Sequence, residues 1–285
     1  MKFFDTVCQH SSNYAAQLYG NINFMTPQTL LSHYDTAQIW PSLTDLNVPT
    51  AYQRALAVRA LRLARGEQAR GYKIGFTNRS IWQRYNVSAP VWGTVYDSTL
   101  SFCDGSGTIS LQGISQPRIE PETVFGLRAA PPANATLDEL FNCLDWVAPG
   151  FEIVQSHQIG WKFAAPDAIA DGALHAKLLV GPKVPVRDIA NSAQALCDKL
   201  AASKVRLSQD ASVVDSGAGA AVLDDPLHAL LHFVQEMRQC PGAPQLQAGD
   251  VVTTGTWTDA WPVKAGQTWA ADFDAPLPRL EVAFS

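Results

Sequence analysis

The chain has 285 residues with 47% hydrophobic content and a formal net charge of -5, which predicts a globular protein with a sizeable core in one large domain or two. The acidic balance and the absence of lysine or arginine runs argue against nucleic acid or an anionic membrane surface as its partner. Since the chain has no long apolar stretch and its N-terminus lacks a secretory signal pattern, we expect a protein of the cytoplasm.

Residues 1–70 have a helical character. Within them, Thr50 and Gln53 have the spacing of a capping box, and Gly66 is placed to end the helix that they open. From residue 71 onward, short β-branched and aromatic runs alternate with turn residues, which predicts strands. These runs are YKIGF, TVYD, GTISL, TVFGL, GFEIV, KLLVG, KVRLS, GDVVTTG, QTWAADF and LEVAF.

Two or three helices are expected to interrupt these strands. Thr136 and Glu139 form a second capping-box spacing, and Asp188 is placed to cap the segment IANSAQALCDKLAA. The pair Asp225-Pro226 puts proline at the first position of another helix. We therefore predict an α+β protein in which a helical part, residues 1–70, packs on a strand-rich catalytic part, residues 71–285.

The segment RIEPE, residues 118–122, carries the densest chemical signal. In a strand, Glu120 and Glu122 point to the same face, and Glu152 on a later apolar strand would complete a site for a hard cation. Burying three carboxylates without a cation is costly or forces them to bind protons. The alternative is that both glutamates of RIEPE face solvent on an edge strand, which suits Pro121 because proline donates no ladder hydrogen bond.

Three further places carry polar candidates for a pocket. Lys73 lies in the apolar segment GYKIGFT, where partial desolvation would lower its pKa and suit proton transfer or binding of an anionic substrate; an edge lysine is the alternative. For Asp97 the choice is between a pocket and a turn. The threonines and amides around Gly255 either hold a carboxylate or form a plain strand and turn.

Other patterns favour structural roles. His228 and His232 lie four apart on a helix, but Ala-Leu-Leu stands between them and the leucines mark a buried stripe, which argues against zinc. The five cysteines are scattered without a CxxC pair, which is typical of reduced core thiols. Residues 103–107 predict a hairpin connection. Most tryptophans are expected in the core, although Trp92 and Trp161 could wall a pocket.

Taken in order, several segments resemble the fumarylacetoacetate hydrolase superfamily, and most closely its 2-keto-4-pentenoate hydratase and 4-oxalocrotonate decarboxylase branch. The resemblance runs from about residue 50 to the C-terminus and rests on GYKIGFTNRS, the pair Tyr96-Asp97, RIEPETVFGL, FEIVQSH with Trp161, DAIADGALHAKLLVG, LQAGDVVTTGT and the final apolar strand. It implies a mixed β-roll fold. It also implies a Mg²⁺ or Mn²⁺ ion held by Glu120, Glu122 and Glu152, with a 2-oxo or 2-hydroxy-dienoic acid as the bound small molecule.

The resemblance also implies roles for residues beyond the glutamates. Lys73 matches the active-site lysine of the family, and Asp97 matches its pocket acid. Thr254 and Gly255 match the site near the substrate carboxylate, and Trp161 is expected beside the substrate.

The chain departs from the branch in two places. Residues 170–175 read Ala-Asp-Gly-Ala-Leu-His where the branch usually has Ala-Asp-Asn-Ala-Ser, and Gln155 replaces a common aspartate. The first departure introduces His175, which is expected either to transfer a proton near neutral pH or to hydrogen-bond a loop.

A cation bound to a 2-oxo acid stabilises the enolate that forms when a proton is lost at C3. Water addition and β,γ-decarboxylation both pass through such an enolate. We therefore predict a metal-dependent hydratase of a 2-hydroxy-alka-2,4-dienoate, in the catabolism of aromatic or related compounds, that forms a homo-oligomer. The alternative is a 2-oxo-3-enedioate decarboxylase of the 4-oxalocrotonate type, whose second carboxylate would favour an extra cation; the sequence offers Arg79, Arg84 and Arg118 without placing them.

A third hypothesis is a non-catalytic partner subunit, because the asparagine and serine of the branch are missing near residues 172–175. The presence of Lys73 and of all three glutamates argues against this hypothesis.

Overall fold

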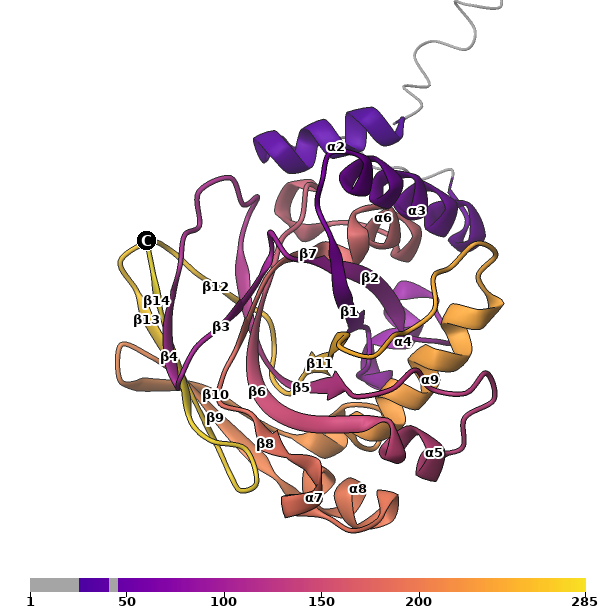
Figure 1. Cartoon of the computed structure of the whole chain (residues 1–285). Helices are drawn as coiled ribbons and strands as arrows, with labels where there is room; N and C mark the ends of the chain where they lie inside the picture. The colour runs from indigo at the N-terminus through magenta and orange to yellow at the C-terminus, as the bar shows by residue number, and fades with distance from the viewer. Residues whose placement is uncertain (1–25, 41–45) are drawn as a thin grey trace, which may run out of the picture.

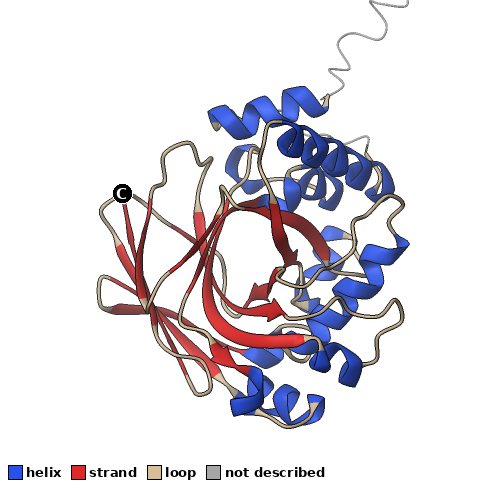
Figure 2. Ribbon diagram, in the orientation of Figure 1, coloured by secondary structure: helices blue, strands red, loops and turns tan. Residues whose placement is uncertain are grey.

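Two sheets form the body of the protein, and most of the helices lie around the outer side of the larger, curled sheet (Figure 1, Figure 2). The computed structural model describes residues 26–40 and 46–285. The helical character that the sequence predicts for residues 1–25, and the position of Cys8, therefore lie outside the described residues. The mixed α and β architecture of the rest agrees with the predicted fold class.

The larger sheet contains β1 (Ala69–Gly75), β2 (Val91–Tyr96), β3 (Leu100–Phe102), β5 (Arg118–Leu127), β6 (Leu144–Val154), β7 (His175–Val180), β8 (Val184–Pro185), β11 (Val251–Thr256) and β12 (Trp261–Pro262). Its main path is β2-β1-β11-β5-β6-β7-β3, with β12 paired to β5 and β8 paired to β6. The smaller sheet contains β4 (Ser106–Ile109), β9 (Lys204–Gln209), β10 (Ser212–Ala218), β13 (Thr268–Phe273) and β14 (Leu280–Phe284). Its order is β10-β9-β13-β14-β4. Each of the ten predicted apolar runs overlaps one of these strands.

The described helices are α2 (Pro27–Thr36), α3 (Val48–Ala64), α4 (Trp82–Tyr85), α5 (Leu137–Asn142), α6 (Ala165–Ala170), α7 (Val186–Ile189), α8 (Ala193–Ala202) and α9 (Pro226–Gln239). Short 3₁₀ turns occur at η1 (Arg79–Ile81), η2 (Ile159–Trp161), η3 (Gly172–Leu174) and η4 (Gly219–Ala221). None of the helices that the structure describes has the length and apolar content needed to cross a membrane.

Two of the four predicted helix starts are confirmed. The Thr136 capping box opens α5, and the Asp225 side chain accepts hydrogen bonds from the first turn of α9. The other two are wrong, because Asn47 caps α3 and Ser192 caps α8. In each of these cases an Asx or serine side chain a few residues away offers the backbone a better acceptor than the predicted residue.

The predicted hairpin at residues 103–107 is also wrong. This segment does connect two strands, β3 and β4, but β3 pairs in parallel with β7 whereas β4 pairs in parallel with β14. The chain therefore crosses here from the larger sheet to the smaller one. Local turn residues indicate that a strand ends, but they do not specify which sheet the next strand joins.

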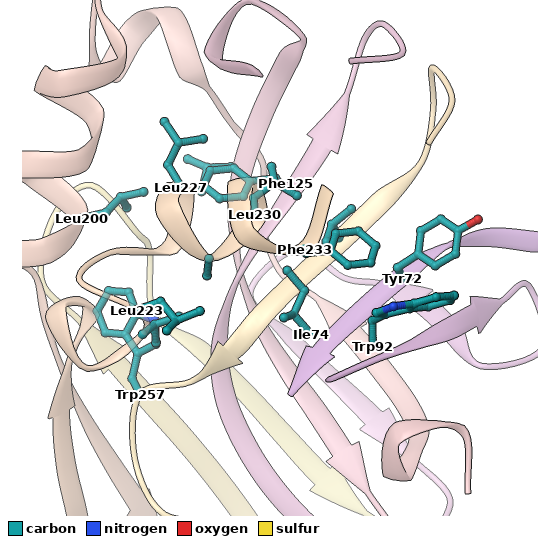
Figure 3. Packing of buried hydrophobic residues seen from close by; sticks show 14 of the residues in the cluster. Tyr72, Ile74, Trp92, Phe125, Leu200, Leu223, Leu227, Leu230, Phe233 and Trp257 are labelled. Carbon is teal, nitrogen blue, oxygen red and sulfur yellow. The ribbon is translucent and has the colours of Figure 1, made fainter. Parts of the chain in front are cut away.

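The hydrophobic core lies between α9 and the larger sheet. Leu227, Leu230 and Phe233 of α9 pack toward Phe125 and the β1 residues (Figure 3). The same cluster includes Ala51 and Tyr52 of α3, and Tyr52 stacks on Trp92 with ring centroids 4.9 Å apart. The helical part is thus fused to the strand-rich part through a shared core, and a domain boundary near residue 70 stays a prediction.

Gly71 allows the close approach of β1 to β11. Its φ is +147°, and a Cβ atom at this position would lie 1.8 Å from the Val251 backbone oxygen on the parallel partner strand. We expect Gly71→Ala to lower the free energy of unfolding by about 3 kcal/mol, because the clash is with backbone and cannot relax by rotation of a side chain.

The matched control is Gly66→Ala. Gly66 has a φ of +105° but no atom within 4 Å of the added methyl, so only backbone strain of about 1 kcal/mol is expected. Urea unfolding of both variants measures the difference, and equal losses would contradict the assigned clash.

Candidate metal centre

Three carboxylates converge where β5 pairs with β6. Glu120 lies opposite Glu152 in the antiparallel register, and Glu122 lies two residues further along the same face. One oxygen from each carboxylate lies within 4.8 Å of the others. Glu122 and Glu152 are fully buried, and Glu120 is partly exposed. Because β5 runs between β11 and β6, it is a central strand and the edge-strand alternative does not apply.

β11 holds the Glu122 carboxylate in place. Glu122 Oε2 accepts a hydrogen bond from the Thr253 hydroxyl and another, of 2.7 Å, from the Gly255 backbone N–H. The β5–β11 register shifts between Thr253 and Thr256, and Gly255 has a φ of +104°. A Cβ at Gly255 would lie 1.9 Å from Thr77 Oγ1, so this bulge requires glycine.

This arrangement corrects the role predicted for Thr254. Its hydroxyl is buried and donates to the Thr123 backbone oxygen at 3.0 Å, so it does not reach the cavity. Gly255 does line the cavity, but its N–H is directed to Glu122. The residue that the sequence analysis missed is Thr253, and the alternation of side chains along β11 was the signal that could have identified it.

Lys73 and His175 contact the two oxygens of Glu152. Lys73 Nζ lies 3.2 Å from Glu152 Oε2 and donates a 2.9 Å hydrogen bond to the Ala173 backbone oxygen. His175 Nδ1 lies 2.9 Å from Glu152 Oε1, and its Nε2 lies 2.9 Å from the Thr99 hydroxyl. Lys73 and His175 come from β1 and β7, so these two strands and β11 supply the groups around the glutamates of β5 and β6.

The ionisation of these groups reflects burial and mutual charge. Burial raises the pKa of Glu120 to about 7, although the charge of Lys73 opposes the shift. Burial and the two neighbouring glutamates raise the pKa of Glu122 well above its usual value. Burial alone would lower the pKa of Lys73, but the charges of the three glutamates outweigh it and the net direction is upward. The lowered lysine pKa expected from the sequence is therefore wrong, because that expectation left the carboxylates out.

The residues present fit a divalent cation. Glu122 Oε1 and Glu152 Oε2 are buried and accept no hydrogen bond from the described residues, although Lys73 Nζ is close to the latter. Three carboxylates face a single buried ammonium group, which leaves an excess of negative charge in the interior. Hard oxygen ligands with an unmet need for positive charge are what Mg²⁺ or Mn²⁺ binds in proteins.

A cavity of about 410 Å³ opens onto this cluster. Lys73, Glu120 and Glu122 line one part of it. An aromatic wall lines another part, with ring-centroid distances of 4.8 Å for Phe76–Tyr85, 5.6 Å for Tyr85–Phe163 and 6.0 Å for Phe163–Trp161. Trp161 thus lies at the cavity as predicted, whereas Trp92 packs in the core against Tyr52.

Two predicted catalytic residues, Asp97 and His175, do not line the cavity. Asp97 is exposed in the turn between β2 and β3, where its Oδ1 accepts hydrogen bonds of 3.0 Å from the N–H groups of Gln68 and Ser98. Its turn interpretation is therefore the one that the structure supports. His175 is buried behind Glu152 and is absent from the cavity lining, and burial lowers its pKa. This placement favours hydrogen bonding to Glu152 over proton transfer to a ligand in the cavity.

The sequence did not predict a buried histidine–aspartate pair, His157 and Asp171. His157 Nδ1 lies 2.8 Å from Asp171 Oδ1, and the His157 ring stacks on Trp40 with centroids 4.6 Å apart. Tyr34 donates to the Asp171 backbone oxygen. These contacts attach the segment containing α2 to the turn that precedes His175, and no local pattern in the sequence connects residues so far apart.

Comparison with known proteins assigns the chain to a family. No family model matches the chain. It is 31% identical to a 2-hydroxyhexa-2,4-dienoate hydratase of Comamonas testosteroni over 245 residues, which cover 84% of this chain and 89% of that protein. It is 30% identical to a 4-oxalocrotonate decarboxylase of a Pseudomonas species, over 79% of this chain and 84% of that protein. The chain belongs to the 2-keto-4-pentenoate hydratase and 4-oxalocrotonate decarboxylase family.

Solved structures confirm the fold expected of this hydratase and decarboxylase family. A 4-oxalocrotonate decarboxylase from Pseudomonas putida G7, complexed with magnesium and adipate, aligns with a TM-score of 0.81 at 22% identity, over 91% of this chain and 95% of that one. A fumarylpyruvate hydrolase from Pseudomonas aeruginosa, in complex with Mn²⁺ and pyruvate, aligns with a TM-score of 0.54 at 14% identity, over 75% and 88%. These structures confirm the predicted β-roll fold, and the related hydratase and decarboxylase confirm the prediction of a lyase.

The raised pKa values predict how the stability of the metal-free protein depends on pH. A neutral Glu120 stabilises the fold below the ordinary glutamate pKa of 4.5, and this contribution is lost as pH rises through its folded value of about 7. After chelator treatment, we expect the melting temperature to fall as the pH rises from about 5 to about 7. Added Mn²⁺ should reverse the fall. A Glu120→Gln variant should reduce the slope without abolishing it, because the pKa of Glu122 is raised as well. An unchanged slope in this variant would contradict the assignment.

The contact between His175 and Glu152 predicts an effect on cation affinity. We expect His175→Ala to weaken Mn²⁺ binding by about 10- to 100-fold, because the carboxylate loses the group that orients it. Calorimetric titration measures this change. His232→Ala on α9, outside the cavity lining, is the matched control and should bind Mn²⁺ as the wild type does.

Proposed function

We propose that this chain is a divalent-metal-dependent hydratase that adds water to a 2-hydroxy-alka-2,4-dienoate. The observation that carries the proposal is the convergence of Glu120, Glu122 and Glu152 beside Lys73, with Glu120, Glu122 and Lys73 at the wall of one cavity. The names of the related hydratases supply the substrate class. Mg²⁺ or Mn²⁺ is the proposed ion, since magnesium and Mn²⁺ accompany structures of the same fold.

The bound cation would polarise the carboxylate and C2 oxygen of the substrate and so stabilise the enolate that forms across C2 and C3 when water adds to the chain, before C3 is protonated. Lys73 holds a proton at Nζ, because the neighbouring glutamates favour its charged form. Its ammonium group is thus suited to stabilise negative charge on the substrate or to return a proton. The aromatic wall of Phe76, Tyr85, Phe163 and Trp161 offers flat apolar faces to a planar conjugated chain.

Decarboxylation of a 2-oxo-3-enedioate is the second candidate. It uses the same enolate, and Arg118 in the cavity lining supplies a cation for a second carboxylate. Release of carbon dioxide distinguishes decarboxylation from hydration.

The non-catalytic subunit, the cytoplasmic location and the homo-oligomeric state remain hypotheses. The presence of Lys73 and the glutamate cluster in one cavity supports a catalytic chain over a silent one.

The test is turnover of 2-hydroxypenta-2,4-dienoate after chelator treatment, with and without added Mg²⁺ or Mn²⁺. We expect loss of the dienol absorbance only with the ion, and a hydrated product without carbon dioxide. Carbon dioxide from a dienedioate would favour the decarboxylase instead. Absence of turnover with every dienoate and either ion would refute both.

Lys73→Met should lower kcat by about 100- to 1,000-fold, because a positioned proton carrier is lost from the transition state. In the Mg²⁺-loaded protein its melting temperature should change much less, since the cation offsets the charge of the glutamates and methionine fills a similar volume. Lys204→Met, on an exposed position of β9, is the control and should retain wild-type turnover. Wild-type rates in Lys73→Met would remove this lysine from the mechanism.

A further inference from the structure

Arg118 is a cation of the cavity without an ionic partner. It lines the cavity and is half-buried, and no carboxylate oxygen of the described residues lies within 4.0 Å of it. Its Nη1 donates a long hydrogen bond, of 3.4 Å, to the Ala260 backbone oxygen. Lys73 differs, because Glu152 already contacts it. A desolvated guanidinium that lacks a carboxylate is an open site for an anion.

The position of Arg118 is fixed by Trp161. The guanidinium carbon lies 4.4 Å from the centroid of the Trp161 ring. The Trp161 Nε1–H donates to the Gln116 backbone oxygen at 3.0 Å, and Gln116 Oε1 accepts the Gly160 N–H at 2.8 Å. Trp161 adopts a φ of +60°, which is uncommon for a large side chain. The backbone and the indole thus hold the guanidinium in a set orientation, with its remaining N–H groups available.

The distance from the metal centre suits a short diacid. Arg118 and Glu120 lie two residues apart on β5 and share a face, which separates their Cα atoms by about 7 Å. An extended chain of six or seven carbon atoms, with bonds of about 1.5 Å in a zigzag, has an end-to-end length comparable to this separation. The aromatic wall lies along the same cavity. A ligand that binds the glutamate-held cation at one end can therefore reach Arg118 with the other.

We infer that Arg118, seated on Trp161, binds the distal carboxylate of the substrate, so that the enzyme prefers a 2-hydroxy-dienedioate to a dienoate with an apolar end. This inference rests on the proposed function, because it places the reacting end at the three glutamates. It adds the chemical class of the distal end, which the glutamate cluster leaves open.

The other charged groups near the cavity are compatible with this assignment. Arg79 is exposed, pairs with Asp224 at 2.7 Å and is absent from the lining. Asp215 lines the cavity, but its oxygens accept hydrogen bonds from Ser216 N, Asp259 N and Trp261 Nε1 at 2.7, 3.1 and 2.8 Å. Asp259 is exposed and forms no ion pair with Arg118 within 4.0 Å. The carboxylates on this side of the cavity therefore leave the guanidinium charge unpaired.

The test compares two unreactive 2-oxo acids of equal chain length, 2-oxoadipate and 2-oxohexanoate, which differ only in the distal carboxylate. Calorimetry on the full chain loaded with Mg²⁺ measures both affinities. We expect the wild type to bind 2-oxoadipate about 100-fold more tightly. Arg118→Met should remove most of this ratio and Arg118→Lys should retain part of it. Arg79→Met should keep the wild-type ratio.

Equal affinities for the two acids in the wild type would overturn the inference while leaving the proposed function standing, provided that both bind only with Mg²⁺. Failure of both acids to bind the Mg²⁺-loaded chain would instead overturn the proposed function and the inference with it. A wild-type preference that survives in Arg118→Met would assign the distal carboxylate to another residue. The wild-type ratio is informative even if one variant fails to fold.

The same ratio should appear in catalysis. For Arg118→Met, kcat/KM with a dienedioate should fall at least ten times more than with 2-hydroxypenta-2,4-dienoate, and the fall should lie mainly in KM. A structural effect of the substitution would instead lower kcat/KM equally for the two substrates, and this result would contradict the assignment.

Discussion

The concentration of negative charge between β5 and β6 is the constraint on which the surrounding structure depends. Three carboxylates with oxygens within 4.8 Å of one another repel each other, and burial removes the water that would screen them. Groups from other strands offset this cost. Lys73 brings a charge from β1, Thr253 and Gly255 bring donors from β11, and His175 brings a ring nitrogen from β7. The register of the whole larger sheet is therefore coupled to the chemistry of its centre.

Three irregular backbone positions lie near this centre. The β11 bulge at Gly255 directs an N–H to Glu122, and the register of β6 and β7 shifts between Ile153 and Val154, next to His175. Trp161, with positive φ, lines the same cavity. Regular strands would point these donors along the sheet ladder, so each irregularity directs a group toward the site at a cost that the surrounding core supports.

The charged and apolar parts of the cavity match the corresponding parts of its proposed ligands. Its glutamate end calls for a cation and the chelating end of an oxo acid, and its aromatic wall suits a conjugated chain. Arg118, stacked on Trp161 of that wall, adds a positive charge to the cavity. The glutamate cluster carries the proposed enolate chemistry, whereas Arg118 carries the inferred preference for a diacid. These two properties depend on different side chains and can be separated experimentally.

The sequence by itself determined the local features: ten strand segments, the caps at Thr136 and Asp225, and the shared face of Glu120 and Glu122. These follow from side-chain alternation and from contacts within a few residues, which are properties of the chain. Only the tertiary structure decided that Asp97 accepts a hydrogen bond from Gln68, that His175 lies behind Glu152, and that β3 and β4 join different sheets. The shift in the pKa of Lys73 is upward in the structure, whereas the sequence predicted a downward shift, for the same reason. Each of these properties depends on groups that are distant in sequence and are brought together by strand pairing.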